Sequence, residues 1–421
     1  MTNTSLSRLG SANTYDNAIS NLSNRQSALS SLQENLTSGK KIVRPSDDPT
    51  GAAQAERAMT RINRIATDQR ALAAQRNSIA MAESTLGDVT DALQNFRELV
   101  VGAGSGVQTA ADRKTIALQL TQMRDQIFGL ANRQDTNGQP LFSALGSALA
   151  PFVGPNAPPQ DYTFNGLPGQ ASSSEVAIPS ALDGDSAFML QVARDGAYNI
   201  STSGPSASSA SPLTVNVALT APPTPVTDST YKVSITSVVP GTPGNSTATY
   251  NLQETTTAVP PVTTTQVGLT STNYPTGSLP ITTIAGRLVT ITGTATAGDS
   301  VTITPNPSLF SVLDNAIRDI GNAPSSAAAT QAVGQALGNI DIGMARVSAV
   351  RGQAGALLNR ADTISTNQDA RSIQLEADRA RAEDVDMIKA ISAFQSQQTG
   401  YQAALQSYAQ IQKLSLFNFL S

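Results

Sequence analysis

Apolar side chains recur every seven residues near both ends of the chain, which is the spacing of helices that pair lengthwise. One repeat lies between Ser11 and Ala58, and the other runs almost to the C-terminus. Each repeat predicts a helix with one apolar seam. The predicted seam residues are Tyr15, Ile19, Leu22, Leu29 and Leu36 in the first helix, and Met387, Ile391, Phe394, Tyr401, Leu405 and Tyr408 in the second.

Neither seam has an apolar partner nearby in sequence. Two interpretations follow: the seams pair with each other, or they pair with the same seams on other copies of the chain. A simpler alternative is a helical bundle that only closes on itself.

A hinge is predicted after the first helix, at Gly39, Pro45, Asp47, Asp48 and Pro49. Glycine ends helices, and the two lysines that follow it complement the negative helix end. The residue before Pro45 is biased toward extended geometry. Asp48 can cap a new helix that has Pro49 at its first position.

Further heptads predict a helix from Pro49 to about Val101, on the order of 75 Å long at ~1.5 Å per residue. Gly102 to Gly106 should end it, and Thr109 with Asp112 should cap a third helix. Helical spacing returns at Pro307 and continues from about Ser325 to the C-terminus. The charged stretch from Arg379 to Asp386 is either solvated or a second joint.

The middle of the chain has a different character. Nineteen of the 23 prolines lie between Pro151 and Pro307, and alternating apolar and polar residues predict strands. The predicted strands are 230–235, 247–252 and 288–293, with loops at 221–223 and 259–261. We therefore expect an all-β insertion that can be excised at about 155–303.

The predicted fold class is α+β and multidomain, with long terminal helices forming coiled-coil rods around an inserted all-β middle domain. The expected domains are a terminal coiled coil of 1–44 with 383–421, a helical rod of 45–150 with 307–382, and the β insertion of 151–306.

Composition narrows the function classes. The chain of 421 residues has no Cys, His or Trp and only 4% aromatic residues. Disulfides, thiolate chemistry and imidazole bases are thereby excluded, and a single dense aromatic core is not expected. The net charge of -4 is small and dispersed, so we expect no nucleic-acid partner. We also expect no membrane insertion, no cleaved signal peptide and no cofactor.

Three patterns could carry chemistry, and each has a simpler interpretation. Gly102 to Gly106 resembles a dinucleotide loop but follows a helix rather than a strand, which favours a helix break. Asp47 and Asp48 could form a metal or acid–base pair, but adjacent carboxylates before Pro49 favour capping. Asp183 and Asp185 could bind calcium, although a surface turn is favoured. The aromatic seam near the C-terminus could line a ligand pocket, but its seven-residue spacing favours packing. We expect neither a metal site nor an enzyme.

Several motifs together resemble the bacterial flagellin superfamily over roughly 1–150 and 307–421. They are Leu36–Lys40 followed by Pro45–Pro49, Leu93-Gln94 with Arg97–Leu99, Asp112-Arg113, Leu130–Asn132 with Gly138 and Leu141-Phe142, Arg351-Gly352 with Leu357–Arg360, and Leu414–Phe417. Flagellins proper usually have a serine-rich hinge without flanking prolines. Pro45 and Pro49 therefore make the chain more similar to the hook–filament junction proteins of that superfamily.

The resemblance implies a structural subunit of the flagellum. Its terminal segments would form a coiled coil lining a central channel, and its insertion would face outward. The implied partners are other copies in a ring, the other hook–filament junction protein, flagellin and a flagellar export chaperone. The implied location is extracellular, after export without a cleaved signal. Two alternatives stay open: a filament-forming flagellin, and a secreted adhesin whose insertion binds a surface.

Overall fold

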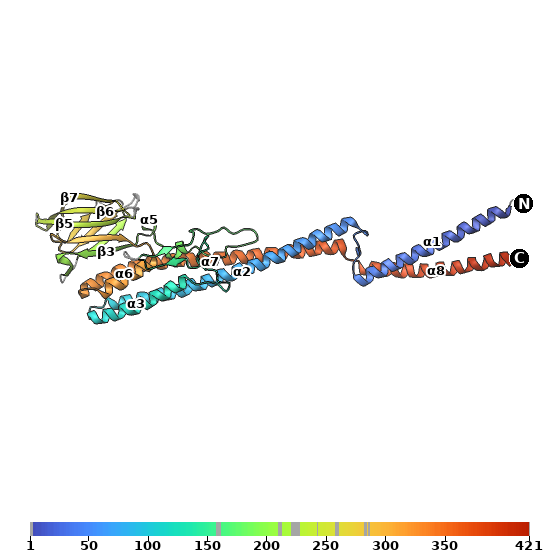
Figure 1. Ribbon diagram of the computed structural model, residues 1–421, viewed down its shortest axis with the longest axis horizontal. Helices are drawn as coiled ribbons and strands as arrows, with labels where there is room; N and C mark the ends of the chain where they lie inside the picture. The colour runs from blue at the N-terminus through green and yellow to red at the C-terminus, as the bar shows by residue number, and fades with distance from the viewer. Residues whose placement is uncertain are drawn as a thin grey trace. The chain divides into compact units, whose positions relative to one another are not determined.

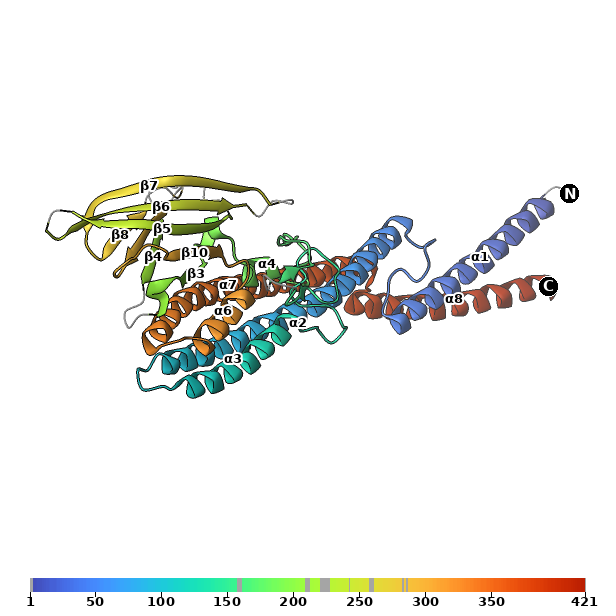
Figure 2. The same cartoon turned by 60° about the vertical axis from the view of Figure 1, so that its left-hand side comes forward.

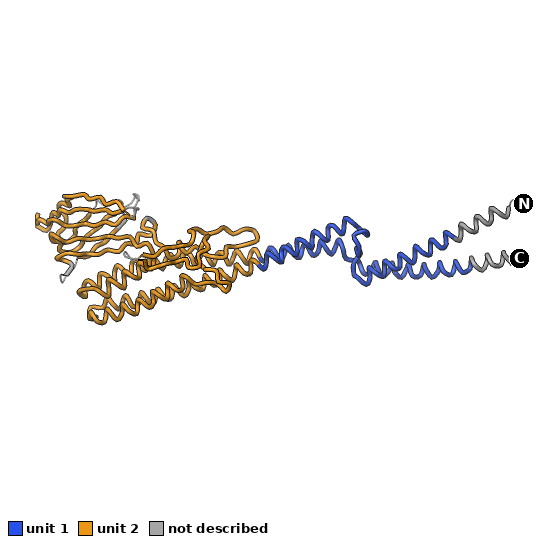
Figure 3. Tube along the Cα trace, viewed as in Figure 1, with its two compact units in different colours: residues 1–70, 365–421 blue, residues 71–364 orange. Residues whose placement is uncertain are grey.

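The computed structural model describes the backbone of residues 3–156, 161–208, 213–219, 228–241, 243–256, 261–281, 284 and 287–420. Within these ranges the side chains of 3–15, 193, 207–208, 218–219 and 411–420 are not described. The chain forms two compact units, one of residues 1–70 with 365–421 and one of residues 71–364 (Figure 3). The boundaries of these two units differ from those of the three predicted domains. The division into three domains therefore stays a prediction.

The first unit consists of four helical stretches. They are α1 (Asn3–Ser38), the beginning of α2 (Pro49–Ala103), the end of α7 (Ser326–Glu383), and α8 (Met387–Leu420). α1 lies beside α8 (Figures 1 and 2). The bounds of α2 confirm the helix predicted from Pro49. The helix expected from Ser325 to the C-terminus is interrupted at Asp384–Asp386, where the backbone takes part in a joint.

The helical part of the second unit is formed by the rest of α2 and α7 with α3 (Ala110–Ala131) and α6 (Leu309–Gly321). The heptad residues of α2 are buried in one core, as the spacing predicts. They include Ile79, Leu86, Leu93 and Val100, and the companion residue Phe96 is equally buried. Ion pairs join α2 to α7 beside this core, for example Arg351 to Glu83 at 2.7 Å.

Local capping explains where these helices begin and end. α2 ends at Ala103, within the glycine-rich stretch, so the helix-break interpretation is confirmed. The Thr109 hydroxyl accepts a hydrogen bond from the Asp112 amide, and the Asp112 carboxylate accepts one from the Thr109 amide. This reciprocal pair is the capping box that the sequence predicts for α3. Ser308 caps α6 by accepting from the Ser311 amide at 3.0 Å.

The buried side chains of residues 141–156 and 161–190 pack in the helical core. This segment includes the strand pair β1 (Phe152–Val153) and β2 (Thr163–Phe164) and the short helix α4 (Gly184–Phe188). The short helix α5 (Val192–Asp195) follows, and its Val192 belongs to the core of the β part. The Phe310 ring of α6 lies with its centroid 5.1–5.7 Å from the centroids of four other rings. These are the rings of Phe128, Phe152, Tyr162 and Phe188.

The expectation that the chain lacks a dense aromatic core is therefore wrong. Its few aromatic residues are concentrated: Phe142 and Phe164 extend the same cluster. Polar contacts fix it in place, because the Tyr162 hydroxyl donates to Asp314 Oδ2 at 2.6 Å, and Arg124 pairs with Asp314 at 3.0 Å.

The inserted β part has two antiparallel sheets that share one buried core. The five-stranded sheet has the order β3 (Tyr198–Ser203), β10 (Ser300–Pro305), β5 (Thr230–Pro240), β6 (Asn245–Thr255), β7 (Thr263–Pro275). The three-stranded sheet has the order β4 (Thr214–Leu219), β9 (Arg287–Thr292), β8 (Ser278–Ile281). A 3₁₀ turn, η1 (Pro205–Ser208), follows β3.

The alternation that predicted the strands determines what this core contains. In β6 every second residue from Ser246 to Leu252 is buried, and Val289 and Ile291 of β9 join the same core. All three predicted strands are confirmed. Residues 221–223 and 259–260 of the predicted loops lie outside the described residues.

The ends of the sheet part lie next to each other. Tyr198 and Pro305 are directly opposed in the β3–β10 ladder, so their Cα atoms are about 5 Å apart. The Asn339 side chain of α7 anchors this point by donating to the Tyr198 carbonyl at 2.8 Å. Phe152, Tyr162 and Phe188 are buried in the helical core. The segment that can be excised is therefore not 155–303, as the sequence predicted, but the residues between Tyr198 and Pro305.

We predict that replacing 199–304 with a short Gly/Ser linker leaves the helical part of the second unit folded, because closing a short loop costs little. Replacing 155–303 should unfold it. That cut removes Tyr162 and Phe188, and each lost core aromatic costs about 3–5 kcal/mol, which together rivals the whole stability of a domain. Thermal unfolding followed by circular dichroism compares the two. Equal melting of both variants would contradict the assignment of 141–190 to the helical core.

Candidate functional site

The two predicted seams meet in a single chain. On α1 the half-buried side chains include Leu22, Leu29, Leu32 and Leu36. On α8 Ala390 is buried, and the half-buried residues that follow keep spacings of four and three. These are Phe394, Gln397, Tyr401, Ala404 and Tyr408. Because α1 ends and α8 begins at the same joint, the pair is antiparallel.

Other predicted seam residues lie on the solvent side of this helix pair. Ile19, Met387, Ile391 and Leu405 are between 43% and 46% exposed, and the neighbouring Ile388 is 83% exposed. We call these five residues the outer stripe. The side chain of Tyr15 lies outside the described residues. The structure thus divides the predicted seams into an inner contact between α1 and α8 and an outer stripe without a partner among the described residues.

A polar layer interrupts the inner contact. A Cβ atom on Gly400 would lie 2.6 Å from Arg25 Nη1, so the guanidinium occupies the space that a side chain would need. Gln397 Oε1 is buried and has no hydrogen-bond partner among the described atoms. A polar residue in an apolar seam favours one register over others. This layer is therefore a candidate for the feature that fixes the register between α1 and α8.

The hinge is a joint of two crossing chain segments. The Lys41 amide donates to the Glu383 carbonyl at 2.8 Å, and the Val385 amide donates to the Gly39 carbonyl at 3.0 Å. An ion pair between Lys40 and Glu383 and a hydrogen bond from Lys41 Nζ to the Arg381 carbonyl reinforce the crossing. The sequence predicted the N-terminal half of this joint by residue. For the stretch from Arg379 to Asp386 it left two interpretations open, and the interpretation as a joint is the one that the structure supports.

The acidic residues of the hinge accept hydrogen bonds from the backbone. Asp47 Oδ2 accepts from the amides of Val43 and Arg44 at 3.2 and 2.8 Å. Asp48 Oδ1 accepts from the amides of Thr50 and Gly51 at 3.1 and 3.0 Å, and so caps α2 at Pro49. The hydrogen bond from the Gly51 amide, and then that from the Thr50 hydroxyl, holds the pKa of Asp48 below its usual range. These contacts favour capping over metal or acid–base chemistry.

Two glycines permit the tight path of the chain. Gly39 ends α1 with φ +73°, a left-handed conformation that suits glycine. At Gly51 an added Cβ would come within 2.5 Å of Ile42 Cδ1 and 2.6 Å of Asp48 Oδ2. Ile42 is buried at this point, so the first turn of α2 is the surface on which the joint packs. Pro45 lies exposed in the turn before it.

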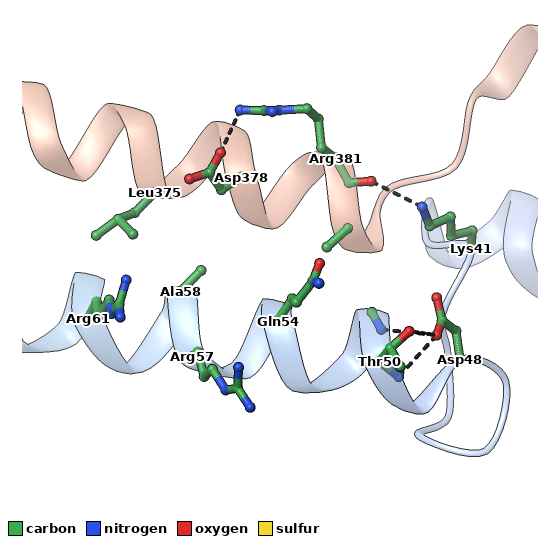
Figure 4. Close-up of a pocket in the computed structure, with 12 residues that line it drawn as sticks. Lys41, Asp48, Thr50, Gln54, Arg57, Ala58, Arg61, Leu375, Asp378 and Arg381 are labelled. Carbon is green, nitrogen blue, oxygen red and sulfur yellow. Dashed lines mark hydrogen bonds and ion pairs between the residues drawn. The ribbon is translucent and has the colours of Figure 1, made fainter.

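Beside the joint a groove of about 490 Å³ runs between the beginning of α2 and the end of α7 (Figure 4). Ala58 and Leu375 face each other across it, and Arg61 lies one turn further along α2. Arg57 and Lys41 also contribute to its lining.

Other candidate chemistry is absent from the described part of the chain. Asp183 caps α4 by accepting from the Asp185 amide at 3.1 Å and from Ser186 Oγ at 2.7 Å. No group of three or more acidic residues with metal-ligand geometry occurs among the residues with described side chains. No described helix has an apolar stretch long enough to cross a membrane.

Paired terminal helices, a hydrogen-bonded joint and an inserted β part together form the architecture of a flagellin-type protein. A family model for the bacterial flagellin N-terminal helical region matches residues 11–146, and one for the C-terminal helical region matches residues 337–420. Together they span more than half of the chain, which therefore belongs to the flagellin family.

Curated relatives match about a third of the chain. Flagellar hook-associated protein 3 of Salmonella typhimurium is 34% identical over 148 residues, 34% of this chain and 46% of the relative. The protein of the same name from Escherichia coli is 35% identical over 141 residues, 33% and 44% of the two chains. The flagellin of Serratia marcescens is 33% identical over 133 residues, 30% and 36%. The chain thus matches less than half the length of each of these relatives.

Solved structures are similar over more of the fold. The flagellar junction protein FlgL from Legionella pneumophila is 25% identical with a TM-score of 0.55, over 74% of this chain and 99% of that one. FlgL of Xanthomonas campestris is 22% identical with a TM-score of 0.56, over 76% and 98%. The second likeness concerns the fold alone.

We predict that Gly51→Val loosens the joint, because its side chain would collide with Ile42 and Asp48. Amide exchange at Lys41 and Val385, whose amides bridge the two segments, should become at least tenfold faster, since about 1.4 kcal/mol of lost protection corresponds to that factor. Gly102→Ala is the matched control: nothing lies within 4 Å of its added Cβ. Unchanged exchange in Gly51→Val would refute the role of Gly51.

Proposed function

We propose that this chain is a non-enzymatic structural subunit of the bacterial flagellum that joins the hook to the filament. The observation that carries the proposal is its similarity, over almost the whole length of that protein, to the junction protein of Legionella pneumophila. The similarity to two proteins named hook-associated protein 3 supports it. The proline-flanked hinge from Pro45 to Pro49 agrees with this assignment.

The outer stripe provides a mechanism of assembly. α1 and α8 cover each other's inner seams within one chain, so the stripe stays available to a neighbouring copy. Burying a large apolar side chain completely contributes about 1.5–3 kcal/mol. Four of the five side chains are already about half covered, so each of those would contribute roughly half of that, whereas Ile388 is 83% exposed and would contribute more. Repeated around a ring of copies, such contacts would add up to a large favourable free energy of association.

The domain division follows as part of the proposal. Segments 1–44 with 383–421 form the assembling coiled coil, segments 45–150 with 307–382 form the helical rod, and 151–306 forms the outward-facing insertion. The hinge, which extends from Gly39 to Pro49, separates the coiled coil from the helical rod. The partners in this role are further copies in a ring, the other hook–filament junction protein, and flagellin.

Export belongs to the same proposal. The subunit would leave the cell through the flagellar secretion channel without a cleaved signal peptide, guarded by an export chaperone, and would function outside the cell. The absence of Cys agrees with this route, since no disulfide has to be reduced before export.

A filament-forming flagellin is the second candidate, because flagellins are about as identical as the hook-associated proteins over similar lengths. The Bacillus subtilis flagellin is 34% identical over 127 residues. A strain without this chain distinguishes the two roles. Electron microscopy should reveal complete hooks without filaments and flagellin released into the medium if the chain is the junction subunit. Filaments that persist on those hooks would overturn the junction role.

We predict that two aspartate substitutions separate the inner seam from the outer stripe. Leu29→Asp places a charge between α1 and α8, where burial without a partner costs several kcal/mol, so the soluble monomer should lose helical content. Leu405→Asp puts the charge on the solvent side. It should leave the helical content unchanged yet prevent filament attachment.

Circular dichroism of purified monomers and filament counts in complemented strains measure the two effects. Ile373→Asp is the control, because Ile373 is an exposed apolar residue of α7 outside the stripe. Normal filament counts with Leu405→Asp would exclude the outer stripe from assembly.

A further inference from the structure

Uncompensated positive charge lies on one face of α2 beside the joint. Arg57, Arg61 and Arg64 are spaced by four and three residues, so they share a helix face. Among the described residues, none of the three has a carboxylate within ion-pair distance. Further along α2, by contrast, Arg76 pairs with Asp362 at 3.1 Å and Arg97 pairs with Asp341 at 2.9 Å. The three arginines beside the joint differ from these two in lacking a carboxylate partner among the described residues.

The carboxylates of the adjacent groove are already engaged. Asp48 accepts hydrogen bonds from the first turn of α2, and Asp378 pairs with Arg381. Lys41 Nζ adds a further positive charge where it donates to the Arg381 carbonyl. Two guanidinium groups of the lining, those of Arg57 and Arg61, remain without an acidic partner (Figure 4).

A further guanidinium nearby has no carboxylate within ion-pair distance among the described residues. Arg379 of α7 directs Nη1 toward the Met59 sulfur at 3.4 Å, and its Nε is buried without a hydrogen-bond partner. Neighbouring positive charges repel one another, so an external anionic group would stabilise the groove.

We propose that the groove binds a carboxylate of a second copy of this chain, supplied by Glu376 on α7 of that copy. This inference rests on the proposed function, because it requires copies arranged side by side around a common axis. In a cyclic arrangement each copy contacts its neighbour through two different surfaces, and residues at the same height along the common axis meet. The surface that contacts the arginines of α2 must therefore be a different surface of the neighbouring copy at the same height.

Glu376 meets this requirement. It follows Leu375, which faces Ala58 across the groove, so it lies at the level of Arg57 and Arg61. It is exposed and has no ion-pair partner among the described residues. Glu56 is also exposed at this level but belongs to the same helix as the arginines. A contact of α2 with α2 would bring arginine to arginine, whereas a contact of α2 with α7 joins opposite charges.

The test is a charge exchange between two variants of the full-length chain. One carries Arg57→Glu and Arg61→Glu, and the other carries Glu376→Arg. Alone, each variant should associate at least tenfold more weakly than the parent at low salt, because every contact joins like charges. An equimolar mixture should recover association, since each variant then supplies the charge that the other needs.

Sedimentation velocity at several salt concentrations measures the association, and circular dichroism verifies that each variant is helical. Arg70→Glu is the matched control, because Arg70 on α2 already bonds to the Ala66 carbonyl and Thr67 Oγ1. Parental association of either variant alone, or no recovery in the mixture, would overturn the proposal.

Filament counts in strains that express one variant, or both together, repeat the test in the cell. Filaments formed with either variant alone would exclude the charge contact while leaving the junction role intact. Filaments in the strain without the chain would instead remove the junction role. In that case the mixing result in vitro still decides whether the groove binds Glu376.

Discussion

A long helix with one apolar face is stable in water only when another helix covers that face. For the two longest pairs in the described part of this chain, the covering helix comes from far along the sequence. α1 is covered by α8, and in the second unit the core residues of α2 pack with those of α7. The outgoing half of the chain therefore cannot reach its folded state before the returning half is available. The joint depends on both halves of the chain in the same way, because its backbone hydrogen bonds connect Gly39 with Val385 and Lys41 with Glu383.

The degree of burial differs between the two units, and this difference has a physical meaning. In the second unit Ile79, Leu86 and Leu93 are completely buried, because additional helices and the segment 141–190 surround them. In the first unit Leu22, Leu29 and Leu36 are only half-buried, because one partner helix cannot enclose a side chain. The inner seam thus supplies less stability per residue than the core of the second unit. Contacts with neighbouring copies would have a proportionally larger effect there.

Much of this fold could be predicted from the sequence, because heptads and alternating strands are local patterns that burial imposes directly. The α2 stripe and the strands β5, β6 and β9 belong to this class. The exact inner contact of α8 could not, since Ala390, Gln397 and Ala404 are too small or too polar to stand out from their neighbours. Which of two adjacent faces of α8 becomes the inner contact depends on where α1 lies, and no pattern within α8 records that position.

The aromatic cluster and the pairing of the two halves of the joint could not be predicted, for a related reason. Phe128, Phe152, Phe188 and Phe310 are scattered along the chain, and no spacing rule connects them. Their meeting depends on the path of the loop between α3 and β3. Likewise Glu383 and Val385 use backbone atoms in the joint, and a backbone contact leaves no signature in side-chain type. The charge of the stretch from Arg379 to Asp386 was visible in the sequence, but its contact with Gly39 to Lys41 was not.

The adjacent ends of the sheet part have an evolutionary consequence. Tyr198 and Pro305 occupy opposite positions of one ladder, so the helices experience the insertion as a single fixed attachment point, whatever its length. Its surface can therefore diverge without compensating change in the helical segments that match the flagellin family. Another β part with similarly adjacent ends would fit the same attachment point without a change in the helices.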